Sequence, residues 1–317
     1  MKYRTPGQSK SLEGFLQHVR GLDPALAEEY EGDPDVGTLA RPCEVFEGRV
    51  AGNRFAVHPM EGWDGTEDGK PTEHTLRRWH RFGSSTAKLI WGGEAYAVQR
   101  DGRANPRQLF MNPSGDPAAD LALLRTALLD GHRSAGEKTD DLVMGLQLTH
   151  SGRFAQPDGH SVPRPAVRGP ALDAAVNLHP DTPVLTDAEI EGIGENMVRA
   201  AVLAWNAGFD FVDVKCCHGY LLHELLGARE RSGPYGGSFE NRTRFLQRVI
   251  RDIRSACPDL GIAARVSVGD LAPFGAPEGG GPGQPLTEAG SRPYLEGFGV
   301  DPGDPQRMDH ALSLIHI

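Results

Sequence analysis

Short apolar runs alternate with amphipathic segments along most of this chain. The apolar runs fall at residues 55–57, 87–91, 142–148, 209–214 and 261–268. Hydrophobic positions repeat at helical spacing within residues 72–84, 117–130, 190–202 and 239–253. Strand-like runs that alternate with helical patterns predict βαβ units and a parallel sheet. About five such units are present, whereas a closed barrel of this kind needs eight strands. The pattern therefore predicts an α/β fold that is either an incomplete barrel or an open sheet.

Segments outside this alternation set the expected organisation. Residues 1–50 form an N-terminal extension, and residues 51–317 form the barrel domain. One helical face within the extension is marked by Leu12, Phe15, Leu16 and Val19. Residues 271–306 are dense in Gly and Pro, and one more helix is expected to begin at 309–315. The final segment, 312–317, does not resemble the end of a domain, so we expect a chain that is truncated at its C-terminus.

Three local signals mark helix boundaries around a long loop. The loop is Pro-rich and covers residues 154–185. Thr186 and Glu189 then have the spacing of a capping box, in which each side chain satisfies a free amide of the first turn. Gly208 is expected to end that helix, and Ser238 is expected to cap the next one.

Composition and charge exclude several classes of protein. The net charge is −10 and no block of Lys or Arg is present, so no nucleic-acid partner is expected. No apolar run reaches the roughly 20 residues of a membrane span, and residues 1–10 lack the apolar core of a signal peptide. The cysteines at 43, 216, 217 and 257 have no CxxC spacing, so neither disulfides nor a metal site is expected. We therefore expect a cytoplasmic protein with no metal and no membrane partner.

The most informative stretch is the run 212–221, an apolar strand that ends in reactive side chains. These are Lys215, Cys216, Cys217, His218 and Tyr220. Reactive groups at the C-terminal end of a buried strand are typical of the active site of a (β/α) barrel. The two cysteines are expected to pack as small hydrophobic residues. His223 follows His218 by five residues, a spacing that does not suit a pair of zinc ligands on one helix face.

Four segments, in this order, resemble motifs of the Old Yellow Enzyme family of FMN-dependent NAD(P)H:flavin oxidoreductases. They are residues 53–60, 94–98, 147–153 and 218–221, the last of which is followed by a matching segment at 235–245. Each lies at an expected strand end or helix start, and the likeness covers about two thirds of the chain. The resemblance implies a TIM (β/α)8 barrel that binds FMN, here incomplete with about the first five βα units.

The resemblance also implies how each matching residue would hold the cofactor. Pro59 and Met60 would lie along the flavin, and the small side chain of Ala95 would let the ring approach the backbone. Gln147 would bind the pyrimidine edge, since an amide both donates and accepts hydrogen bonds. Arg265 would offset the negative charge of the reduced flavin near N1 and O2. Two of these residues have a plainer alternative: Gln147 as a polar strand-end residue satisfied by the backbone, and Arg265 as a surface residue in a helix–strand turn.

Three residues are expected to carry the catalysis. His218, together with the residue at position 215, would hold an oxygen of the substrate, and Tyr220 would donate the proton to the substrate carbon. The family usually has His where this chain has Lys215, so this residue would donate its hydrogen bond as a cation. The Cys motif that holds an iron–sulfur cluster in some relatives is absent. The family's phosphate-binding loops follow its seventh and eighth strands, beyond the five units found here.

We therefore expect an FMN-dependent oxidoreductase that takes hydride from NAD(P)H and reduces an activated alkene or a similar small electrophile, with a homo-oligomer as one possible assembly. Two alternatives stay open. One is a Schiff-base lyase or aldolase, in which Lys215 attacks a carbonyl. The other is an inactive barrel fragment, because open sheet edges favour aggregation.

Overall fold

The computed structural model describes residues 6–29, 35, 37–267, 274–275 and 284–285. The helix expected at 309–315, the chain end at 312–317 and most of the segment 271–306 lie outside the described residues. The chain divides into two compact units, Met1–Arg41 and Pro42–Ile317.

The described part of the first unit is helical. Its elements are η1 (Pro6–Gln8), α1 (Leu12–Leu22), α2 (Pro24–Glu29) and α3 (Gly37–Ala40). The hydroxyl of Ser11 caps α1 by accepting a hydrogen bond from the amide of Gly14 at 3.1 Å. Leu16 and Val19 are buried, as the predicted helical face requires, whereas Leu12 on the same face is exposed.

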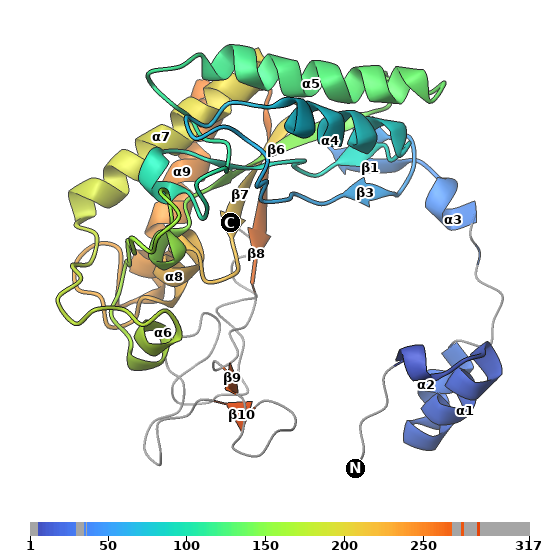
Figure 1. Ribbon diagram of the computed structural model, residues 1–317, viewed down its shortest axis with the longest axis horizontal. Helices are drawn as coiled ribbons and strands as arrows, with labels where there is room; N and C mark the ends of the chain where they lie inside the picture. The colour runs from blue at the N-terminus through green and yellow to red at the C-terminus, as the bar shows by residue number, and fades with distance from the viewer. Residues whose placement is uncertain (1–5, 30–34, 36, 268–273, 276–283, 286–317) are drawn as a thin grey trace. The chain divides into compact units, whose positions relative to one another are not determined.

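The second unit contains a parallel sheet with the strand order β3–β4–β6–β7–β8 (Figure 1). The bounds are β3 (Ala56–Val57), β4 (Leu89–Ile90), β5 (Ala95–Ala97), β6 (Val143–Thr149), β7 (Phe211–Cys216) and β8 (Gly261–Val266). Because β4 and β5 both pair with β6, they form two parts of one barrel strand. The described chain thus supplies five neighbouring parallel barrel strands, which confirms the predicted incomplete TIM barrel.

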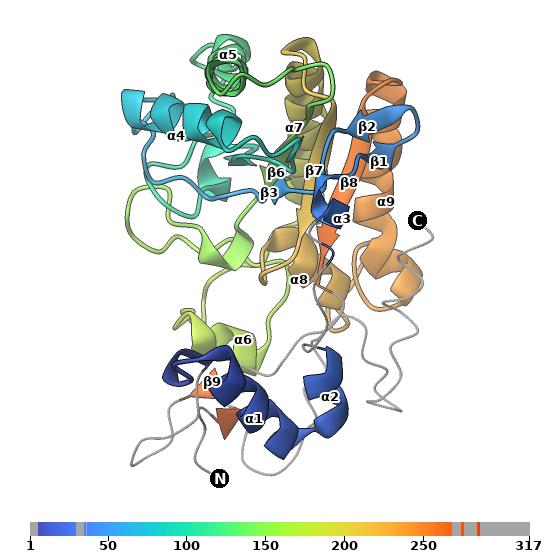
Figure 2. The ribbon, with the colours of Figure 1, turned by 90° about the vertical axis from the view of Figure 1, so that its right-hand side faces the viewer.

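Helices cover the outer face of this sheet, as Figures 1 and 2 show from two sides. They are α4 (Glu73–Ser84), α5 (Pro117–Ser134), α7 (Asp187–Asn206) and α9 (Phe239–Ala256), with α8 (Leu221–Gly227) at the tip of β7. Thr186 and Glu189 form the predicted capping box of α7, and Gly208, with a φ of 85°, follows the helix end. Ser238 caps α9, also as predicted. Within the described residues, every helix is too short or too polar to cross a lipid bilayer.

Side chains that point outward from the strands form one hydrophobic core with the inner faces of the helices. From β6 and β7 they are Met144, Leu146, Leu148, Val212, Val214 and Cys216. Cys216 and Cys217 are both buried, and burial raises the pKa of each thiol. The predicted packing role is therefore confirmed for Cys216, which belongs to this core, and Cys217 is buried beside it.

An antiparallel hairpin of β1 (Cys43–Phe46) and β2 (Arg49–Ala51) lies at the N-terminal end of the barrel strands. The ring centroid of Phe46 is 5.1 Å from that of Phe211, the first residue of β7. Arg49 forms an ion pair with Asp210, which directly precedes β7. Residues 43–50 were predicted as part of the extension, and their contacts are with the barrel strands.

The remaining elements lie in loops. They are η2 (Arg100–Gly102), η3 (Gly152–Phe154), α6 (Pro170–Ala175), β9 (Phe274–Gly275) and β10 (Gln284–Pro285). Helix α6 interrupts the stretch 154–185, which was predicted as loop throughout, and Pro170 stands at its first position, where a proline fits a helix. Strand β7 also extends two residues beyond the predicted run 209–214, so Lys215 belongs to the strand itself.

Candidate active site

Alternate residues of the parallel strands face the barrel interior and form two rows near its C-terminal end. The register pairs Ala95 with Gln147, Gln147 with Asp213, and Asp213 with Ala263; these four residues are the lower row. The upper row, two residues further along each strand, is Ala97, Thr149, Lys215 and Arg265. The fold therefore brings Ala95, Gln147, Lys215 and Arg265 together on neighbouring strands, although they are far apart in the sequence.

Gln147 and Asp213 are joined at the centre of the lower row. The Gln147 amide donates a hydrogen bond to Asp213 Oδ2 at 2.6 Å, and both side chains are buried. Burial raises the pKa of the Asp213 carboxyl, and hydrogen bonds from Gln147 and Trp91 oppose that shift. Ala95 and Ala263 flank the pair, so a polar centre lies between two small side chains.

The upper row carries two cations on neighbouring strands. Lys215 is buried and pairs in register with the half-buried Arg265 of β8. The hydroxyl of Thr149 is buried and has no hydrogen-bond partner among the described residues. A buried hydroxyl without a partner is uncommon in folded proteins, and this one lies in the row that holds the cations.

Glu61, which directly follows Met60, connects the first barrel strand with the end of β7. The Tyr220 hydroxyl donates a hydrogen bond of 2.5 Å to Glu61 Oε2. Lys215 Nζ lies 3.9 Å from the same oxygen and 3.7 Å from the centroid of the Tyr220 ring. Burial, together with Glu61, raises the pKa of Tyr220. Glu61, Lys215 and Tyr220, called the Glu61 cluster below, thus place an acid–base pair beside an amine.

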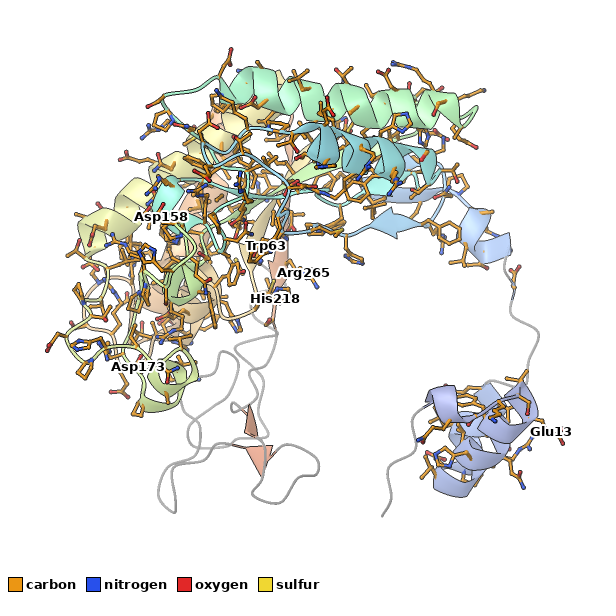
Figure 3. All side chains as sticks on the ribbon, viewed as in Figure 1. Glu13, Trp63, Asp158, Asp173, His218 and Arg265 are labelled. Atoms are coloured by element: carbon orange, nitrogen blue, oxygen red, sulfur yellow. The ribbon has the colours of Figure 1, made fainter. Side chains whose placement is uncertain are left out.

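A tight turn after β7 places His218 and Tyr220. His218 has a φ of 62° and Gly219 a φ of 70°, so two successive residues are left-handed, which is uncommon for a residue other than glycine. Tyr220 then becomes the N-cap residue of α8. His218 is exposed at the tips of β7 and β8, in the same region as Arg265 (Figure 3). Partial desolvation and the cations of Lys215 and Arg265 lower the pKa of His218.

Pro59 and Met60 follow β3 and approach the lower row. The amide of Ala95 donates a hydrogen bond to the carbonyl of Met60 at 2.8 Å. Gly92 lies between Pro59 and Gln147: a Cβ on this glycine would be 3.0 Å from Pro59 Cβ and 3.1 Å from Gln147 Cβ. The absent side chain lets Pro59 lie close to Gln147, and the Met60 side chain is left 49% exposed.

Glu94, in the segment that resembles the second strand end, has a structural role. Its buried carboxylate accepts hydrogen bonds from Arg78 at 2.7 Å, from the Trp79 indole at 3.3 Å and from the Gly62 amide at 3.0 Å. Arg78 also pairs with Asp64 at 2.8 Å. This network fixes the segment that carries Glu61 to α4 and to the start of β5.

The end of β6 is fixed in a similar way. Arg153 is buried and forms ion pairs with Glu224 at 2.8 Å and with Asp173 at 2.9 Å, which ties the β6 loop to α8 and α6. His150 is buried, its Nδ1 accepts a hydrogen bond from the Gly152 amide at 3.1 Å, and burial lowers its pKa to about 4. These two residues therefore shape the loop.

The prediction from sequence missed Glu61 and Asp213. Asp213 had a detectable signal, because residues two apart on a strand share a face and Lys215 was already a candidate. Glu61 is adjacent to Met60, but only the fold shows that it meets Tyr220, which is 159 residues away in sequence. Over the described ranges, no three His, Cys, Asp or Glu side chains are grouped in a way that could hold a metal ion.

Comparison with known proteins agrees with this geometry. Residues 49–276 match the model of the NADH:flavin oxidoreductase / NADH oxidase family. The chain is 31% identical over 233 residues to an NADPH dehydrogenase of Geobacillus sp. (strain WCH70). That alignment covers 70% of this chain and 61% of the dehydrogenase. It is also 31% identical over 288 residues to an NADH:flavin oxidoreductase of Gibberella zeae. That alignment covers 84% of this chain and 64% of the oxidoreductase.

A solved structure supports the fold. The Old Yellow Enzyme from Pichia sp. aligns with a TM-score of 0.59 and 23% sequence identity, over 72% of this chain and 59% of that one. The chain thus spans about three fifths of the length of each of these three proteins.

Proposed function

Because the chain belongs to the NADH:flavin oxidoreductase / NADH oxidase family, we propose that the protein containing it binds FMN at the C-terminal ends of its barrel strands. We infer that it takes hydride from NAD(P)H and reduces an activated alkene or a similar small electrophile. FMN and NAD(P)H are the cofactor and reductant of this family, in agreement with the prediction from sequence.

The two rows carry the proposal, because they fit a flat heterocycle with an amide-like edge. The alanines of the lower row leave space over the sheet, and Gln147 supplies both a donor and an acceptor beside it. The buried hydroxyl of Thr149 has no hydrogen-bond partner among the described residues, as expected of a group whose partner is a bound ligand. Arg265 supplies a fixed positive charge one strand from Lys215.

Each residue then has a distinct role. FMN, when bound, supplies the carrier that accepts and passes on hydride. Ala95, Pro59 and Met60 form the surface for the ring, Gln147 binds its edge, and Arg265 stabilises negative charge there.

The substrate would be oriented from the tip of β7. Lys215 and His218 donate hydrogen bonds to the substrate's oxygen, and Tyr220 supplies the proton for its carbon. The hydrogen bond of 2.5 Å to Glu61 holds the phenol of Tyr220 in place, and its proton leaves that bond when it is passed to the substrate.

Purification of the intact protein with added FMN tests the proposal. We expect a bound flavin with its visible absorbance, which bleaches anaerobically with NADPH or NADH and recovers when a conjugated enone is added. A protein that holds no flavin and oxidises no NAD(P)H would contradict the proposal. Residues 1–317 expressed alone test the inactive-fragment alternative, which a cooperatively melting protein that binds FMN tightly would remove.

The expected cytoplasmic location and a homo-oligomer stay predictions. Light scattering on the purified protein gives the oligomeric state, and a fluorescent fusion in the native host gives the location.

A further inference from the structure

Two buried lysines in this chain have opposite surroundings. Lys88 Nζ contacts four groups, at 2.7 Å to Asp141, 2.8 Å to the carbonyl of Lys138, 3.0 Å to His132 and 3.1 Å to Glu137. Within the described ranges, Lys215 Nζ has one carboxylate within 4 Å, that of Glu61, and the distance of 3.9 Å is beyond hydrogen-bond range. Both lysines are nearly inaccessible, with side-chain exposures of 6% and 5%. Among the described residues, Lys88 therefore has the hydrogen-bonding partners that a buried ammonium requires, whereas Lys215 has the more distant Glu61 and the face of the Tyr220 ring.

These surroundings act on the two amines in opposite directions. Burial lowers the pKa of Lys215, Arg265 lowers it further, and the negative charge of Glu61 only partly opposes that shift. The acidic partners of Lys88 instead raise its pKa above the ordinary value. At a given pH, a larger fraction of Lys215 than of Lys88 is therefore in the neutral amine form. The neutral amine is the nucleophile in imine formation.

From this geometry we propose that Lys215 is a nucleophile that forms an imine with a small aldehyde or ketone, in the same site that is proposed to hold the flavin. The Glu61 cluster supplies the groups that such a step needs: an amine, and a Tyr220–Glu61 hydrogen bond within 3.9 Å of it. Glu61 is 22% exposed and His218 is exposed, so the cluster opens toward solvent on that side.

The step balances within the cluster. A water molecule passes a proton from the ammonium of Lys215 to Glu61, because the two groups are 3.9 Å apart. The lone pair of Lys215 then forms a bond to the carbonyl carbon while the carbon–oxygen π bond breaks. A proton moves from nitrogen to that oxygen and gives a carbinolamine. The proton held by Glu61 returns through the Tyr220 hydroxyl to the same oxygen, the carbon–oxygen bond breaks, and water leaves an iminium. No oxidant or reductant takes part.

Reductive trapping without FMN or NAD(P)H tests the proposal. The intact protein is incubated near pH 7 with propanal and sodium cyanoborohydride, which reduces an iminium to a propylated amine, and peptide mapping gives the rate at each lysine. We expect Lys215 to react several-fold faster than the exposed Lys70, because burial lowers the pKa of Lys215 and leaves more of its amine neutral, whereas Asp68 raises the pKa of Lys70. Lys88, the matched buried control, should stay unmodified.

Two variants complete the test. Lys215→Arg keeps a cation and should abolish the fast adduct, and Tyr220→Phe should slow it at least several-fold while leaving the Lys70 rate unchanged. Labelling of Lys215 no faster than that of Lys70 in the unmutated protein, or a fast adduct that persists in Lys215→Arg, would overturn the proposal. Flavin binding and NAD(P)H oxidation are measured separately, so failure here leaves the proposed function standing, and the reverse also holds.

Discussion

The hydroxyl of Tyr220 donates a hydrogen bond of 2.5 Å to Glu61 Oε2, joining the first barrel strand to the turn after β7. Glu61 follows the Pro59–Met60 pair, and Tyr220 begins α8. A hydrogen bond to a charged acceptor contributes about 1.5–3 kcal/mol, enough to hold the phenol in one orientation. This hydrogen bond therefore links Tyr220, which is expected to supply the proton, to the Pro59–Met60 segment, which is expected to hold the flavin ring.

Removal of the Tyr220 hydroxyl should separate proton delivery from flavin reduction. In Tyr220→Phe we expect turnover of an activated alkene to fall by about 100-fold, in line with the contribution of a general acid. Flavin reduction by NAD(P)H needs no proton from this residue and should keep its rate. Stopped-flow measurement of the two half-reactions distinguishes them.

Tyr235→Phe is the matched control for that substitution. The Tyr235 hydroxyl is also hydrogen-bonded, to Glu191 at 3.1 Å and to Arg248 at 3.2 Å, but it lies between α7 and α9. Alkene turnover that fell equally in both variants, or in neither, would contradict the role of Tyr220.

Neutralisation of Arg265 should weaken flavin binding. Loss of a charged hydrogen-bonding group costs about 1.5–3 kcal/mol, so Arg265→Gln should raise the Kd for FMN by about tenfold or more. Quenching of flavin fluorescence during titration gives the Kd. Arg254→Gln, at an exposed position in the last turn of α9, is the control and should bind FMN unchanged; equal affinities of the two variants would place Arg265 outside the flavin site.

Glu94 should be important for stability. Glu94→Ala leaves Arg78 without its buried partner, and breaking a buried ion pair costs about 3–5 kcal/mol. Glu195→Ala, which removes an exposed ion pair with Arg199 at 3.8 Å, should cost less than about 1 kcal/mol. Urea unfolding measures both free energies, and similar values for the two variants would contradict the network around Glu94.

His150 should make the protein sensitive to acid. Burial lowers its pKa from 6.5 to about 4, so as the pH falls below 6.5 the unfolded chain binds a proton that the folded chain does not. Stability linked to this residue is therefore complete above pH 6.5 and is lost as the pH falls towards 4, by about 3 kcal/mol at most.

The substitution His150→Asn isolates that effect, because the amide oxygen can still accept the hydrogen bond from Gly152 but does not titrate. Urea unfolding across this pH range should show a smaller loss for the variant than for the unmutated protein. His160→Asn, at an exposed position, should follow the unmutated protein. Parallel curves for all three proteins would contradict a neutral, buried His150.

The strands and most helices were predictable because their signals are local. Period-two and period-3.6 patterns depend on neighbouring residues, and the caps at Thr186 and Ser238 need only one turn of helix. The family motifs also pointed to Gln147 and Arg265, which the register places in neighbouring rows on strands β6 and β8; their roles in binding flavin stay predictions.

What was not predictable depends on distant contacts. The hairpin at residues 43–51 is stabilised by its contact with Phe211, and no local pattern reports that contact. Glu61 is a candidate because of its contacts with Tyr220 and Lys215, which are distant in sequence. The contrast between Lys215 and Lys88 depends on which acidic side chains the fold brings near each amine. The residues next to either lysine in the sequence do not show which acidic side chains lie near it.

The structure of the intact protein with FMN bound tests the central claim most directly. The account predicts an isoalloxazine ring over Ala95, with its pyrimidine edge within hydrogen-bond distance of Gln147, the Arg265 guanidinium at N1 and O2, and Tyr220 above the opposite face of the substrate site. A flavin bound elsewhere on the protein, or one whose edge contacts neither Gln147 nor Arg265, would contradict it.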